Sequence, residues 1–332
     1  MRILVAPDKF KGTATASQVA GALADGLRAA GHEVTTCPLA DGGEGTLDVF
    51  GGANRTTAVT GPLGDVVDAR WRSSGRTAVI ETAQACGLAL VGGAEGNDAI
   101  AASTYGVGEL ISAAVDAGAR HLLIGVGGSA TTDGGLGALR AMAPLHRYRG
   151  IRIEVACDVA LGFVDAARVF APQKGATPSQ VELLIRRLER LVEVYRDSYD
   201  VDVSVLEGAG AAGGLAGGLA CAGADLVPGF DLVADHLGLH DLLEGVDLVV
   251  TGEGFLDEES FDGKVVGGVA AIAAEAGVPI VAVVGESFDG MDGRIATVSL
   301  TAVHGRDRAM ADVEGCLSGV AQLVLEAARR AR

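Results

Sequence analysis

The sequence predicts an α/β protein made of two domains. Short runs of β-type residues alternate with helical patterns along the whole chain, which is typical of strand–helix–strand units. At 332 residues the chain is long for a single hydrophobic core. Apolar residues make up 49% of it, and this content excludes a disordered protein because enough surface can be buried.

Eight runs are predicted as strands and three segments as helices. The strands are expected at residues 3–6, 33–39, 78–82, 122–126, 153–156, 202–206, 248–251 and 280–284. The helices are expected at 16–30, from 177 onward and at 264–276. In the first helix Val19, Leu23 and Leu27 share one face. The second helix begins with a capping box, in which Thr177 and Gln180 satisfy each other's backbone N–H groups.

The net charge of −17 argues against nucleic acid or an anionic membrane as the main partner, so a small-molecule substrate is expected. A protein this acidic must concentrate its cations where it binds anions. Its four lysines are Lys9, Lys11, Lys174 and Lys264, and each lies within or beside a glycine-containing motif. We expect alanine at Lys11, Lys174 or Lys264 to impair activity while leaving thermal stability almost unchanged.

Cysteine spacing and apolar patterns exclude several other classes of protein. Five widely spaced cysteines without a CxxC pair indicate neither a disulfide framework nor a zinc site. The N-terminal MRILVAPDKFKG has too short an apolar stretch for a signal peptide. The longest uncharged stretch, 208–224, is mostly glycine and alanine and is no membrane span. A cytoplasmic protein is therefore expected.

Polar, glycine-rich segments follow four of the predicted strands. They are residues 7–12, 127–135, 157–158 and 252–254. Ligands of open α/β sheets bind beyond the carboxyl ends of the strands, so these segments are expected to form the ligand site.

The residue types in these segments suit phosphoryl transfer. Glycine-rich loops before helices present backbone N–H groups to anions, and Ser129 and Thr131 add hydroxyl donors. The reaction also needs a carboxylate-held Mg²⁺ and an oriented acceptor hydroxyl. Carboxylates available for these tasks are Asp8, Asp41, Glu44, Asp133, Asp158, Glu253 and Asp257.

A second motif keeps another class of function open. Residues 208–213 (GAGAAG) match the dinucleotide-binding pattern GxGxxG after a predicted strand, and Asp231 lies near the spacing of a ribose-binding acid. The match is weak because the glycines continue through Gly217 and Gly218. A dinucleotide-dependent oxidoreductase and a non-catalytic binding protein therefore remain alternatives. The chain has no GxxxxGK[ST] loop and no protein-kinase motif set.

Taken together, the segments resemble the class I glycerate kinase family. The matching stretches, in family order, are APDKFKGTATA (6–16), PLADGGEGT (38–46), TAVIETAQACGL (77–88), GVGGSATTDGG (125–135), VACDV (155–159), FAPQKGATP (170–178), GAGAAGGLAGGL (208–219) and TGEGFLDEESFDGK (251–264). The resemblance implies a phosphotransferase that moves the γ-phosphate of ATP to a hydroxyl of D-glycerate with Mg²⁺. It also implies a Rossmann-like α/β domain with a parallel sheet, formed by 1–60 and 245–332. A second α/β domain, 61–244, would be inserted, with the active site in the cleft between them.

The resemblance also implies roles for individual residues. Asp158, which follows a predicted strand within the matched CDV, is the candidate base for the acceptor hydroxyl, and Lys11 and Lys174 are further catalytic candidates. Candidate substrate or cofactor ligands are Asp8, Lys9, Asp41, Glu44, Gly127, Gly128, Ser129, Thr131, Asp133, Gly210 and Lys264. Candidate Mg²⁺ ligands are Asp41, Glu253 and Asp257.

Several positions depart from the family pattern. Thr132 and Ala160 replace asparagines, Ala171 replaces a glycine, and Phe255 replaces an arginine after TGEG. The lost side-chain donors predict a less selective acceptor pocket. A kinase of the same family that acts on another small polyol or hydroxy acid is therefore the alternative to D-glycerate.

Overall fold

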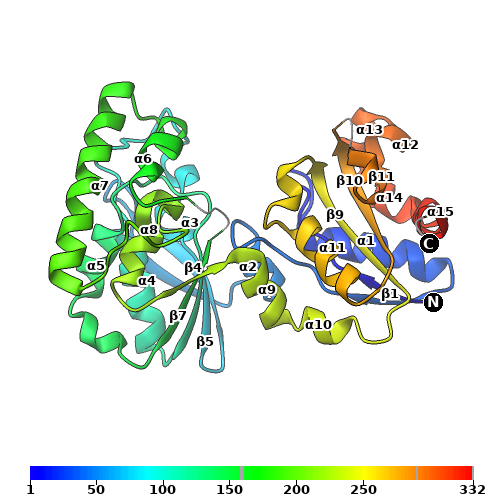
Figure 1. Cartoon of the computed structure of the whole chain (residues 1–332), viewed down its shortest axis with the longest axis horizontal. Coiled ribbons are helices and arrows are strands. Elements are labelled where there is room, and N and C mark those ends of the chain that lie inside the picture. Colours follow the sequence, from blue (N-terminus) through cyan, green and yellow to red (C-terminus); the bar gives the residue numbers. More distant parts are fainter. Residues whose placement is uncertain (158–160, 289–290, 331–332) are drawn as a thin grey trace. The chain divides into compact units, whose positions relative to one another are not determined.

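The structure is a computed structural model that describes residues 1–157, 161–288 and 291–330. It divides into two compact units, each with its own sheet (Figure 1). The first comprises Met1–Asp41 and Phe230–Arg332, and the second comprises Gly42–Gly229. The chain passes between the units at 41/42 and 229/230, and both boundaries come earlier than the expected ones at 60/61 and 244/245. The reason is that strand β3 (Arg55–Thr60) pairs in the second sheet and helix α10 (Leu239–Leu242) belongs to the first unit.

The first unit holds an open five-stranded sheet in which every pairing is parallel. Its order is β11-β10-β9-β1-β2, with β1 Arg2–Val5, β2 Glu33–Thr36, β9 Leu248–Leu256, β10 Ile280–Ser287 and β11 Ala296–Ser299. Counted within the unit, this is the flavodoxin-like order 2-1-3-4-5, whose topological switch point lies between β1 and β9. The expected α/β class with a parallel sheet is confirmed.

Helices cover both faces of this sheet. Side chains of successive strand residues point to opposite faces. Val283 packs with α1 (Ala16–Ala29), α14 (Val313–Gly319) and α15 (Ala321–Arg330). Its neighbours Ala282 and Val284 pack on the other face with α11 (Val265–Glu275). The unit also contains α9 (Gly229–Leu237), α12 (Leu300–His304), α13 (Arg306–Ala311) and the 3₁₀ helices η4 (Glu259–Phe261) and η5 (Met291–Gly293).

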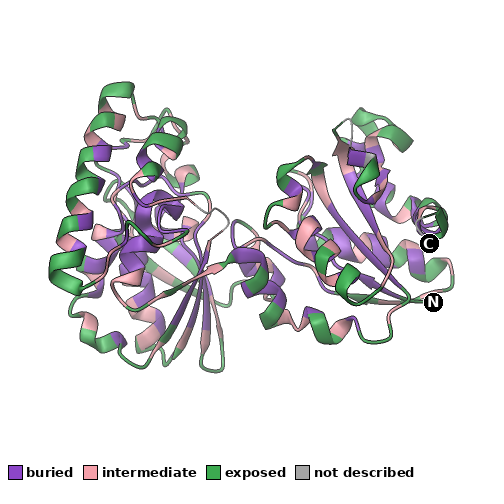
Figure 2. Ribbon diagram, viewed as in Figure 1, coloured by how far each residue is buried: buried purple, intermediate pink, exposed green. Residues whose placement is uncertain are grey.

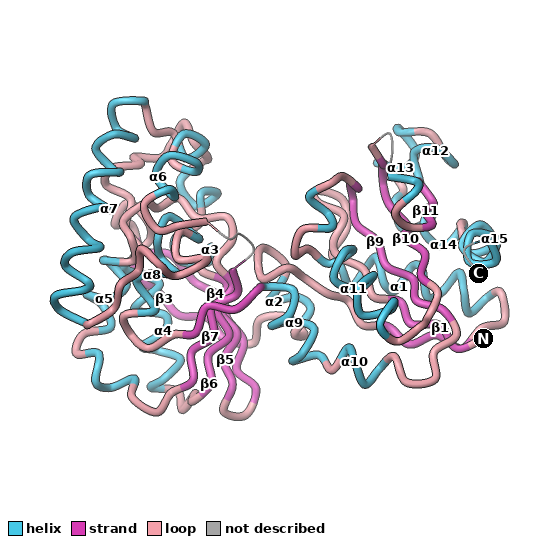
Figure 3. Tube along the Cα trace, in the orientation of Figure 1, coloured by secondary structure: helices cyan, strands magenta, loops and turns pink. Residues whose placement is uncertain are grey.

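The second unit is built on a six-stranded mixed sheet of order β3-β4-β5-β6-β7-β8. Strands β5 (Thr77–Glu81), β6 (His121–Gly125), β7 (Arg152–Cys157) and β8 (Asp225–Pro228) are parallel. Strands β3 and β4 (Val66–Ser74) are added in antiparallel pairings at one edge (Figure 3). The central strands of both sheets are mostly buried, whereas many helices expose one face (Figure 2).

The helices of the second unit form two layers. Helices α4 (Tyr105–Asp116), α5 (Leu136–Met142) and α8 (Ala211–Ala220) contribute to the core of the sheet. Helices α6 (Asp165–Phe170) and α7 (Pro178–Tyr199) form a second core around Phe163 and Tyr195. Shorter elements are α2 (Thr46–Val49), α3 (Ala83–Cys86), η1 (Leu88–Val91), η2 (Leu145–Tyr148) and η3 (Pro172–Lys174). Among the described residues, no helix combines the length and hydrophobicity needed to cross a bilayer.

Most of the expected elements are present, and the capping box of Thr177 and Gln180 starts α7 as predicted. The prediction of a strand at 202–206 is wrong. The segment forms turns in which Val205 is 77% exposed, and the Asp202 carboxylate accepts from the Ser204 N–H at 3.1 Å. Strands β3, β4, β8 and β11 were not predicted because they are short or expose many polar residues.

The glycine tract at 208–218 brings backbone against backbone. A Cβ on Gly213, whose φ is +72°, would lie 2.0 Å from the Thr131 carbonyl oxygen. Gly210, expected to bind a ligand, is buried and donates its N–H to the Leu161 carbonyl at 2.9 Å. The tract follows turns and not a strand, so the context that a dinucleotide-binding loop requires is missing. These glycines serve close packing.

We predict that Gly213→Ala destabilises the protein much more than Gly223→Ala. Both positions have positive φ, +72° and +85°, so both variants carry the left-handed backbone cost of about 1–2 kcal/mol. Only at Gly213 does the new Cβ meet backbone, which should add roughly 2 kcal/mol or more. Urea unfolding of the two variants measures the difference, and equal losses would contradict the packing role.

Candidate active site

Two carboxylates lie at the switch point of the first sheet. Asp8 follows β1, and its N–H donates to the Gly252 carbonyl of β9 at 2.8 Å. Glu253 is the next residue of β9. Crevices at such switch points are where open α/β sheets bind ligands. The structure thus brings Asp8 and Glu253 together, as expected from their strand-end positions.

These carboxylates carry more negative charge than their surroundings compensate. Burial raises the pKa of Asp8 to about 6, while Lys9 at 3.6 Å opposes the shift and Asp41 adds to it. Burial also raises the pKa of Glu253 to about 7, and the charges of Asp8 and Asp257 add to this effect. The Glu253 Oε1 is buried without a hydrogen-bond partner among the described residues. The arrangement favours a ligand that brings positive charge.

A divalent cation fits this donor set. Mg²⁺ binds carboxylate oxygens and would neutralise the mutual repulsion of Asp8, Asp41 and Glu253. Asp257 is a poorer candidate than expected because its Oδ1 accepts from the Ser260 N–H at 3.0 Å and the Ser260 hydroxyl at 3.2 Å. Its carboxylate therefore stabilises the turn into η4.

The lysines of the first unit flank the same strand ends. Lys9 forms an ion pair with Asp8, and Lys264 is the N-terminal cap residue of α11 and lies 3.2 Å from Glu259. Lys11 is exposed, and its backbone lies beside β9. A Cβ built on Gly254 would lie 3.3 Å from the Lys11 backbone nitrogen. All three lysines can therefore accompany an anion bound at these strand ends.

Glu253 should make the metal-free protein less stable as the pH rises. Its pKa is about 7 in the folded protein against 4.5 as the reference, so the folded state binds the proton more tightly. Stability is then lost between about pH 4.5 and pH 7. Between pH 5 and pH 8, the wild type should lose on the order of 2 kcal/mol more than Glu253→Gln in EDTA. Urea titrations measure the free energy of unfolding of both proteins across this pH range. If the two curves run parallel, the raised pKa of Glu253 is wrong.

In the second unit a buried cation holds the glycine loop after β6. Lys174 is 4% exposed, and its Nζ donates to the Ser129 hydroxyl at 2.9 Å and to the Thr131 carbonyl at 2.7 Å. Burial lowers the pKa of Lys174 to about 8, although the charge of Asp133 opposes this shift. The structure brings Lys174, Ser129 and Thr131 together, but Ser129 is 6% exposed and Thr131 is fully buried. Their expected role as hydroxyl donors to phosphate stays a prediction. Lys174 holds the buried side of this loop through these two hydrogen bonds, and Gly127 and Gly128 form the more exposed part of the loop.

The burial of Lys174 argues against the expected lack of effect on stability. In Lys174→Ala, the Ser129 hydroxyl and the Thr131 carbonyl lose their donor and a cavity opens. The loss should be about 2–4 kcal/mol. Lys11→Ala, at an exposed lysine, should change stability by less than about 0.5 kcal/mol. Equal unfolding midpoints for the two variants would show that the Lys174 contacts contribute nothing to folding.

Asp133 has a structural task instead of the expected ligand contact. Its Oδ2 accepts from the Thr104 N–H and hydroxyl, both at 2.9 Å, and from the Gly137 N–H at 3.2 Å. Its Oδ1 accepts from the Gly135 N–H at 3.1 Å. Both oxygens are used to start α5 and to join it to α4. Asp133 is therefore removed from the candidate ligands.

Glu44 lies in an exposed position of the loop that crosses the ends of β6 and β7. Sequence reasoning missed a second acid behind it, Glu81, which binds the backbone of this loop. The available signal was an acid at the end of a predicted strand within a matched motif. The candidate base Asp158 lies outside the described residues, directly after β7.

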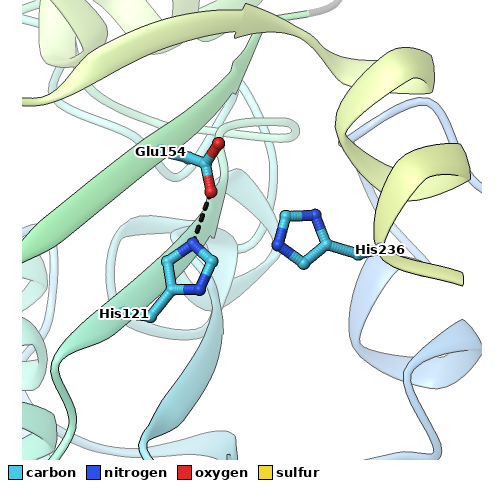
Figure 4. A group of neighbouring side chains, drawn as sticks. All are labelled: His121, Glu154 and His236. Carbon is cyan, nitrogen blue, oxygen red and sulfur yellow. Dashed lines mark hydrogen bonds and ion pairs between the residues drawn. The ribbon is translucent and has the colours of Figure 1, made fainter.

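A histidine–glutamate pair lies toward the amino ends of β6 and β7, away from these loops. His121 begins β6 and forms a hydrogen bond with Glu154 of β7, as Figure 4 shows. Arg152 lies 2.7 Å from the same carboxylate. His121 is thus no part of the residues gathered at the carboxyl ends of the strands.

Known proteins are similar to this chain over most of its length. A family model described as the glycerate kinase family matches residues 3–145 and 142–332. The chain belongs to the glycerate kinase family. Glycerate 2-kinase of Escherichia coli K12 is 38% identical, over 87% of this chain and 86% of that protein. Glycerate kinase of Halalkalibacterium halodurans is 37% identical, over 87% of each.

A solved structure extends the similarity to the fold. The crystal structure of a proposed glycerate kinase 2 from Salmonella typhimurium LT2 superposes with a TM-score of 0.82. The two chains are 35% identical, and the match covers 99% of each. The similarity to the glycerate kinase family therefore holds for both the sequence and the fold.

Proposed function

We propose that this protein transfers the γ-phosphoryl group of ATP to a hydroxyl of D-glycerate with Mg²⁺. The observation that carries this proposal is similarity over most of the chain to proteins named glycerate kinase. The chemical groups at the strand ends support it, since both units retain groups suited to anions. The dinucleotide alternative is disfavoured because its glycine motif is buried in packing.

The groups of each unit suit different parts of phosphoryl transfer. Asp8, Asp41 and Glu253 would hold Mg²⁺, which when bound neutralises charge on the phosphates. Lys9, Lys11 and Lys264 would stabilise the phosphate oxygens. In the second unit the loop at 127–129 offers backbone N–H groups, with Lys174 fixing its shape. Asp158 is the candidate that orients the acceptor hydroxyl and accepts its proton.

A different acceptor is the second candidate, and an apolar surface favours it. Phe255, at the position expected to be arginine, is 42% exposed and Phe288 is 60% exposed. Their ring centroids lie 5.2 Å apart at 84°, an edge-to-face pair at the ends of β9 and β10. D-Glycerate has little apolar surface to cover these rings. A larger, less acidic polyol would use them better.

The two acceptors can be separated by steady-state kinetics with ATP–Mg²⁺. We expect kcat/KM for D-glycerate to exceed about 10⁴ M⁻¹s⁻¹, within the ordinary range of enzymes. Glycerol, L-glycerate and larger polyols serve as comparison acceptors, and ATP hydrolysis without acceptor is the blank. A value for D-glycerate below about 10³ M⁻¹s⁻¹, with another acceptor at least tenfold better, would replace the acceptor and keep the kinase.

A further inference from the structure

Glu81 binds the loop that carries Glu44. It is the last residue of β5 and is 8% exposed. Its Oε1 accepts from the Gly45 N–H at 3.0 Å and the Leu47 N–H at 2.7 Å. These N–H groups belong to the start of α2, whose cap residue is glycine and offers no side-chain acceptor. A carboxylate from a strand more than thirty residues away therefore caps this turn.

The same loop lies directly on the ends of the neighbouring strands. A Cβ on Gly125 would lie 2.5 Å from the Gly42 carbonyl oxygen, and one on Gly127 would lie 2.8 Å from the Gly43 Cα. A Cβ on Gly42 would meet the Ala156 side chain at 2.5 Å. Because no side chain fits between loop and strands, the backbone around Glu44 has little freedom. Glu81 supplies the polar anchor for this contact.

The position of Glu81 is electrostatically expensive. Burial raises the pKa of Glu81, and the negative charge of Glu44 adds to the increase, while the two backbone N–H groups oppose it. Gly45 has a φ of +95°, a left-handed conformation that serine and aspartate rarely adopt, so a side-chain cap at this position is disfavoured and the acceptor comes from another strand. Gly45 directly follows Glu44, so this acceptor also fixes the backbone beside Glu44.

We propose that Glu81 is a positioning residue that holds Glu44 against the hydroxyl groups of the acceptor. An ionised carboxylate accepts hydrogen bonds from hydroxyls and is repelled by phosphates and by an acceptor carboxylate. Glu44 is exposed at the strand ends, so its oxygens can reach a small ligand. This inference rests on the proposed function, since it names the acceptor contact within that reaction.

The test is a double-mutant cycle of Glu44→Ala and Glu81→Ala, read as KM for the acceptor and kcat. Each single variant should raise the acceptor KM about tenfold or more, with a smaller change in the KM for ATP. Glu81→Ala in the Glu44→Ala background should then change the KM less than about threefold, because groups that act through one another are not additive. Glu81→Gln keeps an acceptor oxygen and should stay within about threefold of wild type.

Glu109→Ala is the matched control. Glu109 of the same unit also binds backbone, accepting from the Thr60 N–H of β3 at 2.6 Å, and lies on α4 and not in the loop that carries Glu44. Its loss should lower the unfolding midpoint without changing the acceptor KM. The proposal is overturned if the losses at Glu44 and Glu81 multiply. An unchanged acceptor KM in folded Glu81→Ala also overturns it.

Amide exchange gives a readout that does not depend on turnover. Protection of the Gly45 and Leu47 N–H groups should fall at least tenfold in Glu81→Ala and much less in Glu81→Gln. Unchanged protection in Glu81→Ala overturns the anchoring role even in a fully active enzyme. Absence of phosphoryl transfer in the wild type, with protection lost as expected, would instead refute the proposed function and the acceptor contact while leaving the anchor in place.

Discussion

The close contact of glycine backbones in the second unit is the constraint on which its loops depend. The 42–45 loop lies on Gly125 and Gly127, and the 208–218 tract lies on the loop after β6. At distances where a methyl group would overlap a carbonyl oxygen, backbone position is fixed by excluded volume. Rigid placement of this kind is what preorganised binding of an anion or a hydroxyl requires. Lys174, Asp133 and Glu81 then satisfy the polar groups that such packing buries.

The predicted ligand sites of the two units bury charges of opposite sign. In the first, buried carboxylates at the β1 and β9 ends have raised pKa values, so the site favours a cation. In the second, a buried ammonium has a lowered pKa and two uncharged acceptors. Each imbalance costs folding free energy in the absence of ligand. Stability given up at particular residues in this way is typical of functional sites.

The sequence predicted the buried parallel strands well because these are short, continuous apolar runs flanked by glycine. It also predicted which strand ends carry polar residues, because these residues directly follow the apolar run of each strand in the sequence. It missed β3 and β4, whose exposed faces alternate weakly, and placed a strand at 202–206 where an Asx turn forms. The tasks of Asp133, Gly210 and Glu81 depend on contacts with residues distant in sequence. Such contacts leave no pattern within a window of sequence.

The chain order of the first unit has a consequence for synthesis on the ribosome. β1 lies between β2 and β9, but β9 begins at Leu248, long after β1 has been made. The second unit is continuous and complete before that point, so it can fold while the first still lacks its central neighbour. At about 5–20 residues per second, β1 and the apolar face of α1 wait for at least ten seconds. During that interval the apolar residues of β1 and α1 lack their core partners in β9, α14 and α15, and exposed apolar surface of this kind is prone to aggregation.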